Sequence, residues 1–381
     1  MKKIAIVDTS DFNTYPVGGQ LTSIQSFIKY IALERSHEIE LILIGITRNE
    51  NEVDQQLVRV IGGKKYQFIP IYCDKNDPQS PKVSLRKCFF KALMKHRKVI
   101  RGLKLDMVYI HTPEAFLPVK LANKKLEIVT FSHGNYYALF DKIRFSKYKN
   151  VMIKFVVNCY ITFLIKHSNQ VFVLDTTTYT DYKKYNKNVE KVMNSIDLEQ
   201  FKRSKPIQTE HIQGVYVGRL SQNKNIDKII MAYKDLPLQH KLKIIGNGEM
   251  HEALSNLIKE HHLEEQVVLI GSKTQEELPK YYHDANLLIM NSDVEGLPMV
   301  ILEALSSGLP IVTTPVGAIP EMIQDGIHGR FTNGTSNDIR MKMLELLPDI
   351  KRISTSNTKY AKQFGYQTVN KEICNILLKV Q

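Results

Sequence analysis

The sequence contains few cysteines and no long apolar run. Its four cysteines are scattered through 381 residues, and no two of them form a C-x-x-C pair. Such spacing excludes a dense disulfide framework, argues against structural zinc and is typical of a reducing compartment. No signal peptide is visible, because Met1 is followed by only a short apolar stretch, IAIV, before Asp8. The longest apolar stretch, Val151–Ile165, falls short of the ~20 residues of a membrane span and is predicted to be a buried helix. We therefore expect a cytoplasmic protein.

A dinucleotide-binding fingerprint is also missing. A nicotinamide dehydrogenase needs a G-x-G-x-x-G/A loop with an acidic residue about twenty positions further on. Residues 246–251, GNGEMH, come nearest to this pattern but lack the third small residue. A dehydrogenase is therefore kept only as an alternative.

Length and charge indicate two domains with different partners. A chain of 381 residues with 43 % apolar residues is large enough for two domains, each with its own core. Residues 1–205 hold 34 Lys/Arg and 19 Asp/Glu, a net charge of +15, whereas residues 206–381 hold 18 and 20, a net charge of −2. The positive charge of the first half predicts an anionic partner there: a membrane surface, a polyphosphate-linked acceptor or nucleic acid.

The most informative stretch is Asn291–Pro320. It places two carboxylates, Glu295 and Glu303, eight positions apart. The pattern predicts a strand, a tight loop and a helix that begins at Pro298, since proline fits the first helical turn. The free N–H groups of such a helix end attract a phosphate or diphosphate, and ionised carboxylates accept hydrogen bonds from hydroxyls. An anion site beside two carboxylates suits a nucleotide sugar, which carries both phosphates and hydroxyls.

The run EGLPMVILEALSSGLPIVTTPVGAIPEMI resembles the signature of the retaining glycosyltransferases of family 4, and Glu295 with Glu303 resembles their E-x7-E motif. The resemblance implies the GT-B fold, an α/β protein whose two Rossmann-like domains have parallel sheets and face each other across a cleft. It also implies that Glu295 contacts hydroxyls of the donor sugar and that Glu303 binds the ribose. Backbone N–H groups would come from the loop of Gly296, Leu297 and Pro298.

A second group of candidate residues follows the predicted strand Gly214–Gly218. Arg219 and Lys224 are two cations, five positions apart, just before a predicted helix. Such cations can hold a diphosphate and stabilise its charge as it leaves. The segment VGRLSQNK resembles the family's Gly-Arg-Leu…Lys motif. The resemblance also assigns to the donor site Gly218, the G-x-G loop with Asn247 and Gly248, and Lys273 beside the base.

In the first half, candidate residues follow predicted parallel strands, whose carboxyl ends gather ligands in doubly wound sheets. Gly18 and Gly19 lie between the first strand, Lys2–Asp8, and a helix. A glycine pair there allows close approach of a ligand, or serves a turn that needs positive φ. His133 follows the strand Glu127–Ser132. The resemblance implies that the Gly18–Gly19 loop approaches the donor phosphate and that His133 reaches the donor sugar.

Residues 82–104 are strongly basic, with nine Lys/Arg and no Asp/Glu. Apolar side chains recur there at helical spacing, which predicts a helix with one apolar and one basic face, at Leu85, Phe89, Leu93, Ile100 and Leu103. Two interpretations stay open: an interfacial helix on anionic lipid, or a packed crossover helix with a solvated basic face. Residues 142–149, KIRFSKYK, add four basic residues and favour the membrane interpretation.

We place the N-terminal, acceptor-binding domain at residues 1–203 and the C-terminal, nucleotide-sugar-binding domain at residues 204–365, with the last helix, residues 366–381, crossing back to the first domain. The resemblance implies transfer of a sugar from a UDP- or GDP-linked donor, with retention of configuration, to a glycan or lipid-linked acceptor in surface polysaccharide or glycolipid synthesis. The sequence has no D-x-D motif, so no metal or other cofactor is expected, and basic residues do the work of a metal ion.

Two further alternatives share some of these features. A nucleotide-sugar 2-epimerase has the same fold but uses no acceptor. A nucleic-acid-binding protein would explain the charge but would leave Glu295 and Glu303 without a role, so no nucleic acid is expected as a partner.

Overall fold

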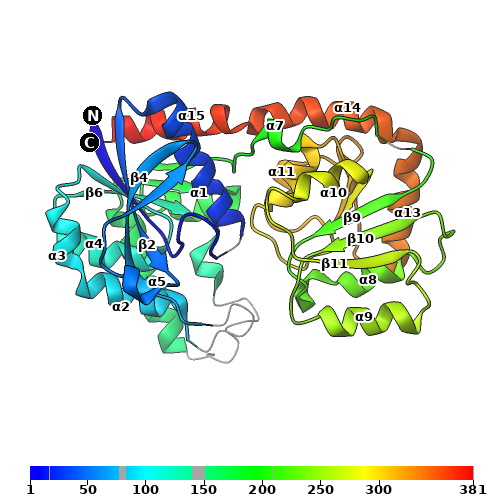
Figure 1. Cartoon of the computed structure of the whole chain (residues 1–381), viewed down its shortest axis with the longest axis horizontal. Helices are drawn as coiled ribbons and strands as arrows, with labels where there is room; N and C mark the ends of the chain where they lie inside the picture. Colours follow the sequence, from blue (N-terminus) through cyan, green and yellow to red (C-terminus); the bar gives the residue numbers. More distant parts are fainter. Residues whose placement is uncertain (17, 77–82, 140–150, 208, 381) are drawn as a thin grey trace. The chain divides into compact units, whose positions relative to one another are not determined.

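The computed structural model describes residues 1–16, 18–76, 83–139, 151–207 and 209–380. The chain forms two compact units (Figure 1). Unit 1 comprises Met1–Asn194 together with Tyr366–Gln381, and unit 2 comprises Ser195–Gly365. Each unit is an α/β domain with its own sheet and its own apolar core.

In the described part of the chain, unit 1 is built on an eight-stranded sheet in the order β3-β4-β2-β1-β5-β6-β7-β8. Neighbouring strands pair in parallel, except that β3 and β4 form an antiparallel hairpin. Strands β5 and β7 are buried at every position, which is why they read as continuous apolar runs. The strands are β1 (Lys2–Val7), β2 (Ile39–Thr47), β3 (Leu57–Ile61), β4 (Lys64–Cys73), β5 (Met107–Ile110), β6 (Glu127–Ser132), β7 (Gln170–Val173) and β8 (Val189–Lys191).

The last helix of the chain, α15, belongs to unit 1 and packs beside α1 (Figure 1). The carbonyl groups of Leu377 and Val380 accept hydrogen bonds from the Lys2 ammonium at 3.2 and 2.8 Å, a favourable position for a cation at the end of a helix. The helices of unit 1 are α1 (Gly19–Tyr30), α2 (Leu85–Lys95), α3 (Arg97–Gly102), α4 (Phe116–Ala122), α5 (Val151–His167), α6 (Thr176–Lys183) and α15 (Tyr366–Lys379).

The basic segment forms two helices rather than one. His96 separates α2 from α3, because its backbone leaves the helical region (φ −93°, ψ 19°). The apolar side chains of Phe89 and Leu93 are buried in the core of unit 1, whereas the lysines of α2 are exposed. The apolar stripe therefore packs against protein and is not available to lipid. Residues 82 and 142–149 of the predicted basic surface lie outside the described residues.

Helix α5 is not the buried helix that its apolar sequence predicts. Its C-terminal half packs into the core through Ile161, Leu164 and Ile165. On another face of the same helix, Phe155 and Val156 are 67 % and 60 % exposed. Large apolar side chains lie on both of these faces, so the composition alone could not show which face remains in water. No helix among the described residues is long and apolar enough to cross a membrane.

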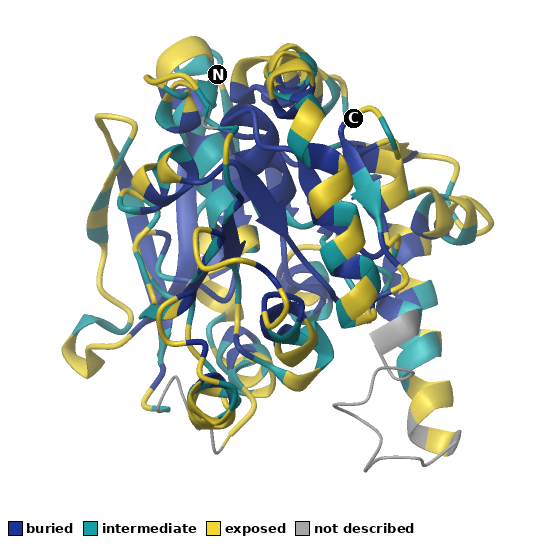
Figure 2. Cartoon of the chain, turned by 90° about the vertical axis from the view of Figure 1, so that its right-hand side faces the viewer, coloured by how far each residue is buried: buried dark blue, intermediate teal, exposed yellow. Residues whose placement is uncertain are grey.

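Unit 2 has a six-stranded parallel sheet in the order β11-β10-β9-β12-β13-β14. Its strands are β9 (Gln213–Val217), β10 (Lys241–Ile245), β11 (Val267–Gly271), β12 (Leu287–Ile289), β13 (Ile311–Thr313) and β14 (Gly329–Phe331). Its helices are α7 (Leu198–Phe201), α8 (Ile226–Met231), α9 (His251–Glu260), α10 (Leu278–Asp284), α11 (Met299–Ser306), α12 (Ile319–Met322), α13 (Ser336–Leu346) and α14 (Ile350–Ala361). Strands in Figure 2 are mostly buried, whereas many helices expose one face.

Each sheet has one point at which the strand order reverses. In unit 2 this point lies between β9 and β12, since β10 and β11 are added on one side and β13 and β14 on the other. Ligands of open α/β sheets bind outside the carboxyl ends of the strands at such a point. The loop after β9 contains Arg219 and Lys224, and the loop after β12 contains Glu295. In unit 1 the reversal lies between β1 and β5, which are followed by Gly18 and by His111.

The boundary between the units lies between Asn194 and Ser195, not at residue 203. The polar, proline-containing segment after residue 201 suggested a linker at the later position. Helix α7 instead packs on α10 and α11 of unit 2, and Phe201 is 1 % exposed. The first residues after the boundary are thus anchored to unit 2 before the polar segment begins.

Candidate active site

Hydrogen bonds join the loops that follow β9 and β12. The N–H of Asp293 donates to the carbonyl of Asn223 at 2.9 Å. The side-chain amide of Asn225 donates to the carbonyl of Asn291 at 3.1 Å and to Asp293 Oδ1 at 2.6 Å. Asn225 has a left-handed backbone (φ 44°, ψ 45°), which asparagine tolerates better than most residues. These bonds fix the two loops against each other at the reversal point of the sheet.

Lys224 and Glu295 meet where these loops join. Lys224 Nζ lies 2.5 Å from Glu295 Oε1, and the two side chains are 19 % and 11 % exposed. Ser292 Oγ donates to the same carboxylate oxygen at 2.7 Å. Because the ion pair is largely shielded from water, its attraction is strong and its removal on one side is costly. The structure therefore holds one cation and one carboxylate in fixed positions at the predicted ligand-binding edge.

A third loop, which follows β13, packs against the backbone of Glu295. Gly317, in the loop after β13, has a left-handed backbone with φ 58°. A Cβ atom at this position would lie 2.1 Å from the carbonyl oxygen of Glu295, so both the conformation and the space require glycine. The N–H of Ala318 donates to the carbonyl of Gly296 at 3.2 Å. The backbone of the Glu295–Gly296 loop is thus held by its neighbour.

Helix α11 begins one residue later than predicted. Pro298 has an extended backbone (φ −71°, ψ 123°) and is the N-cap, and the first helical residue is Met299. Proline has no N–H to offer a ligand, so in the loop of Gly296, Leu297 and Pro298 only the first two residues can contribute backbone donors. Leu297 is buried, at 6 % exposure.

Glu303 lies inside unit 2 rather than at the mouth of a site. It is 3 % exposed, and its carboxylate accepts hydrogen bonds from Tyr282 OH at 2.6 Å and from Gln275 Nε2 at 3.1 Å. Burial raises the pKa of Glu303, and these two hydrogen bonds oppose the increase. A carboxylate has about four acceptor positions, so Glu303 can still receive a hydroxyl of a ligand while Tyr282 and Gln275 fix its orientation.

The remaining predicted donor-site residues lie on the loops after β9, β10 and β11. Arg219 is 53 % exposed on its side chain and pairs with Glu249 at 3.2 Å. Asn247 Oδ1 accepts a hydrogen bond from the N–H of Gly248 at 2.8 Å, within the G-x-G loop. Lys273 lies 4.0 Å from Glu277. Arg219 and Lys273 are thus on the same edge of the sheet as Lys224, but each has its own carboxylate partner.

Backbone packing explains the glycines of the first two loops. A Cβ atom at Gly246 would lie 1.8 Å from the carbonyl oxygen of Gly218, and one at Gly248 would lie 2.4 Å from that of Leu220. The loops after β9 and β10 therefore pack main chain against main chain. Donor binding is therefore not needed to explain Gly248, and donor binding by Gly218 and Gly248 stays a prediction.

In unit 1, two histidines lie at the carboxyl ends of adjacent strands. His111 follows β5 and His133 follows β6, and His111 Nδ1 lies 3.0 Å from His133 Nε2. Burial, and secondarily the neighbouring His133, lowers the pKa of His111 well below its usual range. Burial, and secondarily Arg86, lowers the pKa of His133 to about 3. Both rings are therefore neutral near pH 7 and share one N–H···N hydrogen bond.

The Gly18–Gly19 pair opens helix α1. Gly18 has φ 162°, which is extended backbone, so the alternative that this glycine serves a positive-φ turn is wrong. A Cβ atom at Gly18 would meet nothing within 4 Å. In the first turn, Gln20 Nε2 donates to Asp8 Oδ1 at 2.5 Å and to the carbonyl of His111 at 3.2 Å. Gln20 thereby joins the loops after β1 and β5, the reversal point of this sheet.

Acid should destabilise unit 1 through the histidine pair. The pKa of His133 in the folded chain is about 3, below the value of about 6.5 for an unfolded chain. Between these values the unfolded chain binds a proton that the folded chain does not, so stability falls as the pH drops through this window. At pH 5 one such imidazole costs about 2 kcal/mol. Between about pH 7.5 and about pH 5, the melting temperature of His133→Gln should therefore fall less than that of the wild type.

The exposed His251 of unit 2 supplies the control for this measurement. His251→Gln should show the same acid loss as the wild type. An equal loss in His133→Gln and wild type would contradict the prediction.

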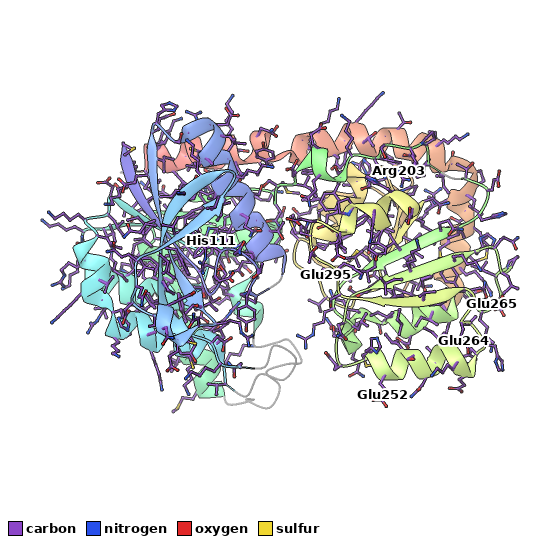
Figure 3. The ribbon with its side chains drawn as sticks, in the orientation of Figure 1. His111, Arg203, Glu252, Glu264, Glu265 and Glu295 are labelled. Carbon is purple, nitrogen blue, oxygen red and sulfur yellow. The ribbon has the colours of Figure 1, made fainter. Side chains whose placement is uncertain are left out.

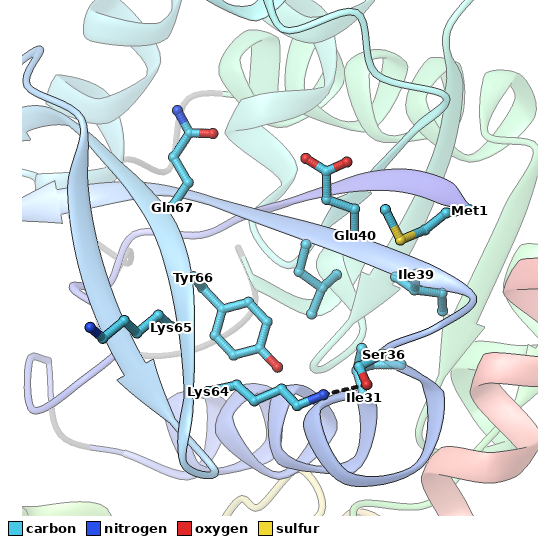
Figure 4. A pocket seen from close by; sticks show the side chains of 10 residues that line it. Met1, Ile31, Ser36, Ile39, Glu40, Lys64, Lys65, Tyr66 and Gln67 are labelled. Atoms are coloured by element: carbon cyan, nitrogen blue, oxygen red, sulfur yellow. Dashed lines mark hydrogen bonds between the residues drawn. The ribbon is translucent and has the colours of Figure 1, made fainter.

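A pocket of about 370 Å³ in unit 1 is separate from these residues (Figure 4). Its lining includes Glu40, Lys64, Lys65 and Tyr66, which lie at the amino ends of β2 and β4. The candidate residues follow the carboxyl ends of the strands, so this pocket lies at the opposite edge of the sheet. No three His, Cys, Asp or Glu side chains of the described residues are arranged to hold a metal ion.

Several residues that position the predicted site residues carry no motif in the sequence. These are Ser292 beside Glu295, Asn225 between the loops, Tyr282 and Gln275 on Glu303, and His111 beside His133. His111 could have been found by the rule that selected His133, because it directly follows the apolar strand β5. Asn225, Tyr282 and Gln275 lie 21 or more positions from their partners, which hides the contact, and Ser292 is a common loop residue without a signal of its own.

Comparison with known proteins agrees with this geometry. Residues 197–364 match the family model described as "Glycosyl transferases group 1". The match covers less than half of the 381-residue chain, and over this region the chain is similar to these glycosyltransferases. The matched region contains Arg219, Lys224, Glu295 and Glu303 and corresponds closely to unit 2.

Curated relatives match different lengths of the chain. An uncharacterized glycosyltransferase of Methanocaldococcus jannaschii is 28 % identical over 40 % of this chain and 44 % of its own length. The chain thus spans less than half of that relative. The N-acetyl-alpha-D-glucosaminyl L-malate synthase of Bacillus anthracis is 24 % identical over 83 % of this chain and 81 % of its own length. The amylovoran biosynthesis glycosyltransferase AmsK of Erwinia amylovora is 34 % identical over 30 % of each chain.

Solved structures confirm the GT-B fold of the whole chain. Sucrose-phosphate synthase of Thermosynechococcus elongatus superposes with a TM-score of 0.81 at 14 % identity and covers 100 % of this chain and 99 % of its own. The HepE protein of Anabaena, solved in complex with UDP, gives a TM-score of 0.74 at 16 % identity over 99 % of this chain and 100 % of its own. At these identities the likeness establishes the fold and not the substrate.

Proposed function

We propose that the protein is a glycosyltransferase that moves a sugar from a nucleoside-diphosphate donor to an acceptor, with retention of anomeric configuration and without a metal ion. The observation that carries this proposal is the shielded Lys224–Glu295 pair at the reversal point of the sheet of unit 2. A diphosphate is recognised by cations and backbone N–H groups, and a sugar is recognised by carboxylates. Lys224, Glu295 and the start of α11 provide all three at one edge of the sheet.

In this proposal the two cations have different tasks. Lys224 is held by Glu295 and can place its charge at the diphosphate without moving. Arg219 is half exposed, and its pairing with Glu249 can give way to a phosphate. Both cations stabilise the charge that develops on the diphosphate as the bond to the anomeric carbon breaks. Their presence supports the expectation that the reaction needs no metal ion.

The carboxylates and the acceptor complete the proposed reaction. Glu295 accepts hydrogen bonds from sugar hydroxyls, and Glu303 accepts one from the ribose. The acceptor hydroxyl attacks the anomeric carbon on the face that the diphosphate leaves, and the departing phosphate oxygen takes its proton. Unit 1 would bind the acceptor, with His133 and the Gly18–Gly19 loop contacting substrate.

Three observations support the substrate class. HepE was solved with UDP, AmsK acts in amylovoran biosynthesis, and the first half of the chain carries a net charge of +15. We propose a UDP- or GDP-linked donor and a glycan or lipid-linked acceptor in surface polysaccharide or glycolipid synthesis. The proposed location is the cytoplasm, at the inner face of the cell membrane.

A thermal-shift panel of UDP, GDP, their sugars and NAD tests the donor site. A ligand at 100 times its dissociation constant stabilises a folded protein by about 2.7 kcal/mol. We expect a uridine or guanosine diphosphate compound to raise the melting temperature of the wild type. Glu303→Ala should lose most of this ligand-induced shift, because the variant lacks the carboxylate that is proposed to bind the ribose.

Glu252 of α9 is the matched control, since it is exposed and lies well away from Glu295 in unit 2 (Figure 3). Glu252→Ala should keep the full ligand-induced shift. If NAD stabilises the wild type and no nucleoside diphosphate does, the donor assignment fails.

A further inference from the structure

We infer that helix α5 docks unit 1 onto an anionic bilayer, with its exposed apolar face in the lipid headgroup region and the lysines of α2 against the lipid phosphates. This inference deepens the proposed function, since the advantage of such docking rests on a lipid-linked acceptor. The surface itself contains none of the proposed donor-site residues, so it can be tested without turnover.

The apolar face of α5 consists of residues at helical spacing, namely Met152, Phe155, Val156, Cys159 and Phe163. Four of them are large hydrophobic side chains with exposed fractions of 72 %, 67 %, 60 % and 39 %, for Met152, Phe155, Val156 and Phe163. Cys159 is also exposed. Positions i, i+3, i+4, i+7 and i+11 fall on one side of a helix. Figure 2 shows the exposure of the first turns of α5.

The geometry of α5 favours a helix lying on a membrane surface. Its opposite side is anchored in the core of unit 1 by Ile161, Leu164 and Ile165. The helix cannot leave the protein to cross a bilayer, and no described helix is long and apolar enough for that. An apolar face that is fixed on a folded domain can instead enter the boundary between headgroups and acyl chains.

The charges around this face indicate an anionic bilayer. Helix α5 contains Lys154 and Lys166 and no acidic residue, and residues 83–104 contain eight Lys/Arg and no Asp/Glu. Both helices pack on the same short turn, Pro113–Ala115. Helix α2 contacts this turn directly, and Tyr160 OH of α5 donates to the carbonyl of Pro113 at 2.7 Å. The exposed basic face of α2 and the apolar face of α5 thus flank one structural element.

A second copy of the chain is a less suitable occupant of this surface. Residues 1–205 carry a net charge of +15, so pairing the apolar faces of two copies would bring two strongly basic domains together. A bilayer with anionic headgroups provides apolar contacts and compensating charge at the same time.

Tryptophan fluorescence can locate α5 directly, because the chain has no tryptophan. Phe155→Trp places a single reporter on the apolar face of α5. We expect its emission to shift to the blue with vesicles of phosphatidylglycerol and phosphatidylcholine, and lipids brominated on the acyl chain should quench it. Met341→Trp is the control, because Met341 is 48 % exposed on α13 of unit 2 and should respond to neither.

Vesicle sedimentation of the full chain, without nucleotide, separates the two contributions. Phe155→Ser with Val156→Ser should weaken binding at least about tenfold, since large apolar side chains leave the interface. Lys87→Glu with Lys91→Glu should weaken binding to phosphatidylglycerol vesicles at least about tenfold and should lower the salt dependence of the binding that remains. The control Met341→Ser with Leu344→Ser removes a comparable exposed apolar pair of α13 and should bind like the wild type.

Two results would overturn the inference. One is an unchanged Phe155→Trp spectrum with phosphatidylglycerol vesicles that bind the protein. The other is a blue shift that grows with protein concentration in the absence of vesicles, which would assign the face to a second copy. The nucleotide-induced thermal shift should persist in all α5 and α2 variants, so failure of membrane docking and failure of the donor site are distinguishable.

Discussion

Lys224→Met should slow the release of nucleoside diphosphate from the donor by about 10²–10³-fold. The ammonium group lies 2.5 Å from Glu295 at 19 % side-chain exposure, and no other described cation pairs with this carboxylate. Methionine fills similar space but removes the charge that is proposed to stabilise the leaving diphosphate. The variant also leaves Glu295 shielded with Ser292 alone, which should destabilise unit 2 by about 3–5 kcal/mol.

A double variant separates these two effects. In Lys224→Met with Glu295→Gln both charges of the pair are gone, so much of the lost stability should return. Turnover should not return, since neither the cation nor the carboxylate is available to the substrate. Nucleotide release and melting temperature are measured on the same samples.

An exposed ion pair of unit 2 provides the comparison. Lys243 and Asp284 lie 3.0 Å apart, with side chains 39 % and 61 % exposed. Lys243→Met should change turnover and stability little, because exposed pairs contribute about 0–1 kcal/mol. If Lys224→Met behaves like Lys243→Met, the Lys224–Glu295 pair is not the site of chemistry.

The GT-B class was predicted from the resemblance of the run from Glu295 onward to a family signature, and most strands of the sheets could be predicted because they depend on local sequence. Buried parallel strands read as apolar runs, and the run from Glu295 onward has a distinctive composition. Strand β3 and the exposed side of α5 are among the features that escaped prediction, for different reasons. Strand β3 (Leu57–Ile61) is an edge strand with Val58 and Val60 exposed at 56 % and 62 %, so it lacks a buried run. The exposed side of α5 escaped because apolar side chains on two opposite faces of a helix do not indicate which face is covered.

The residues of the candidate site were predicted, but the contacts between them and their burial were not. Lys224 and Glu295 were both assigned to the donor, yet their direct contact spans 71 positions and depends on the strand order of the sheet. The same holds for Glu303, which was assigned to the ribose and is buried at 3 % exposure. Its burial follows from Tyr282 and Gln275, whose side chains reach it from an earlier part of the chain. Residue types and spacing predict chemistry, whereas pairing and burial require the topology.

Arg203→Met should destabilise unit 2 by about 3–5 kcal/mol, the largest loss of stability that we expect from a residue outside the site. The guanidinium donates to four backbone carbonyls, at 3.1 Å to Ser307, 2.5 Å to His283, 2.8 Å to Tyr282 and 2.6 Å to Ala285. These carbonyls belong to the C-terminal ends of α10 and α11, where a cation is favourable. Burial lowers the pKa of Arg203 to about 10, and Asp284 partly opposes this, so the group stays charged at neutral pH.

The loss should appear first in the two helices that Arg203 joins. Hydrogen exchange of peptides covering α10 and α11 should accelerate in Arg203→Met, while α9 peptides change less. Arg203→Lys keeps a charge but loses the planar fork, so it should be intermediate. The exposed neighbour Lys202, which pairs with Glu199 at 3.3 Å, is the control, and Lys202→Met should cost less than about 1 kcal/mol.

Arg203→Met should also weaken nucleotide binding, because α10 carries Tyr282 and α11 carries Glu303. Unchanged exchange in α10 and α11 would show that the four hydrogen bonds contribute no net stability.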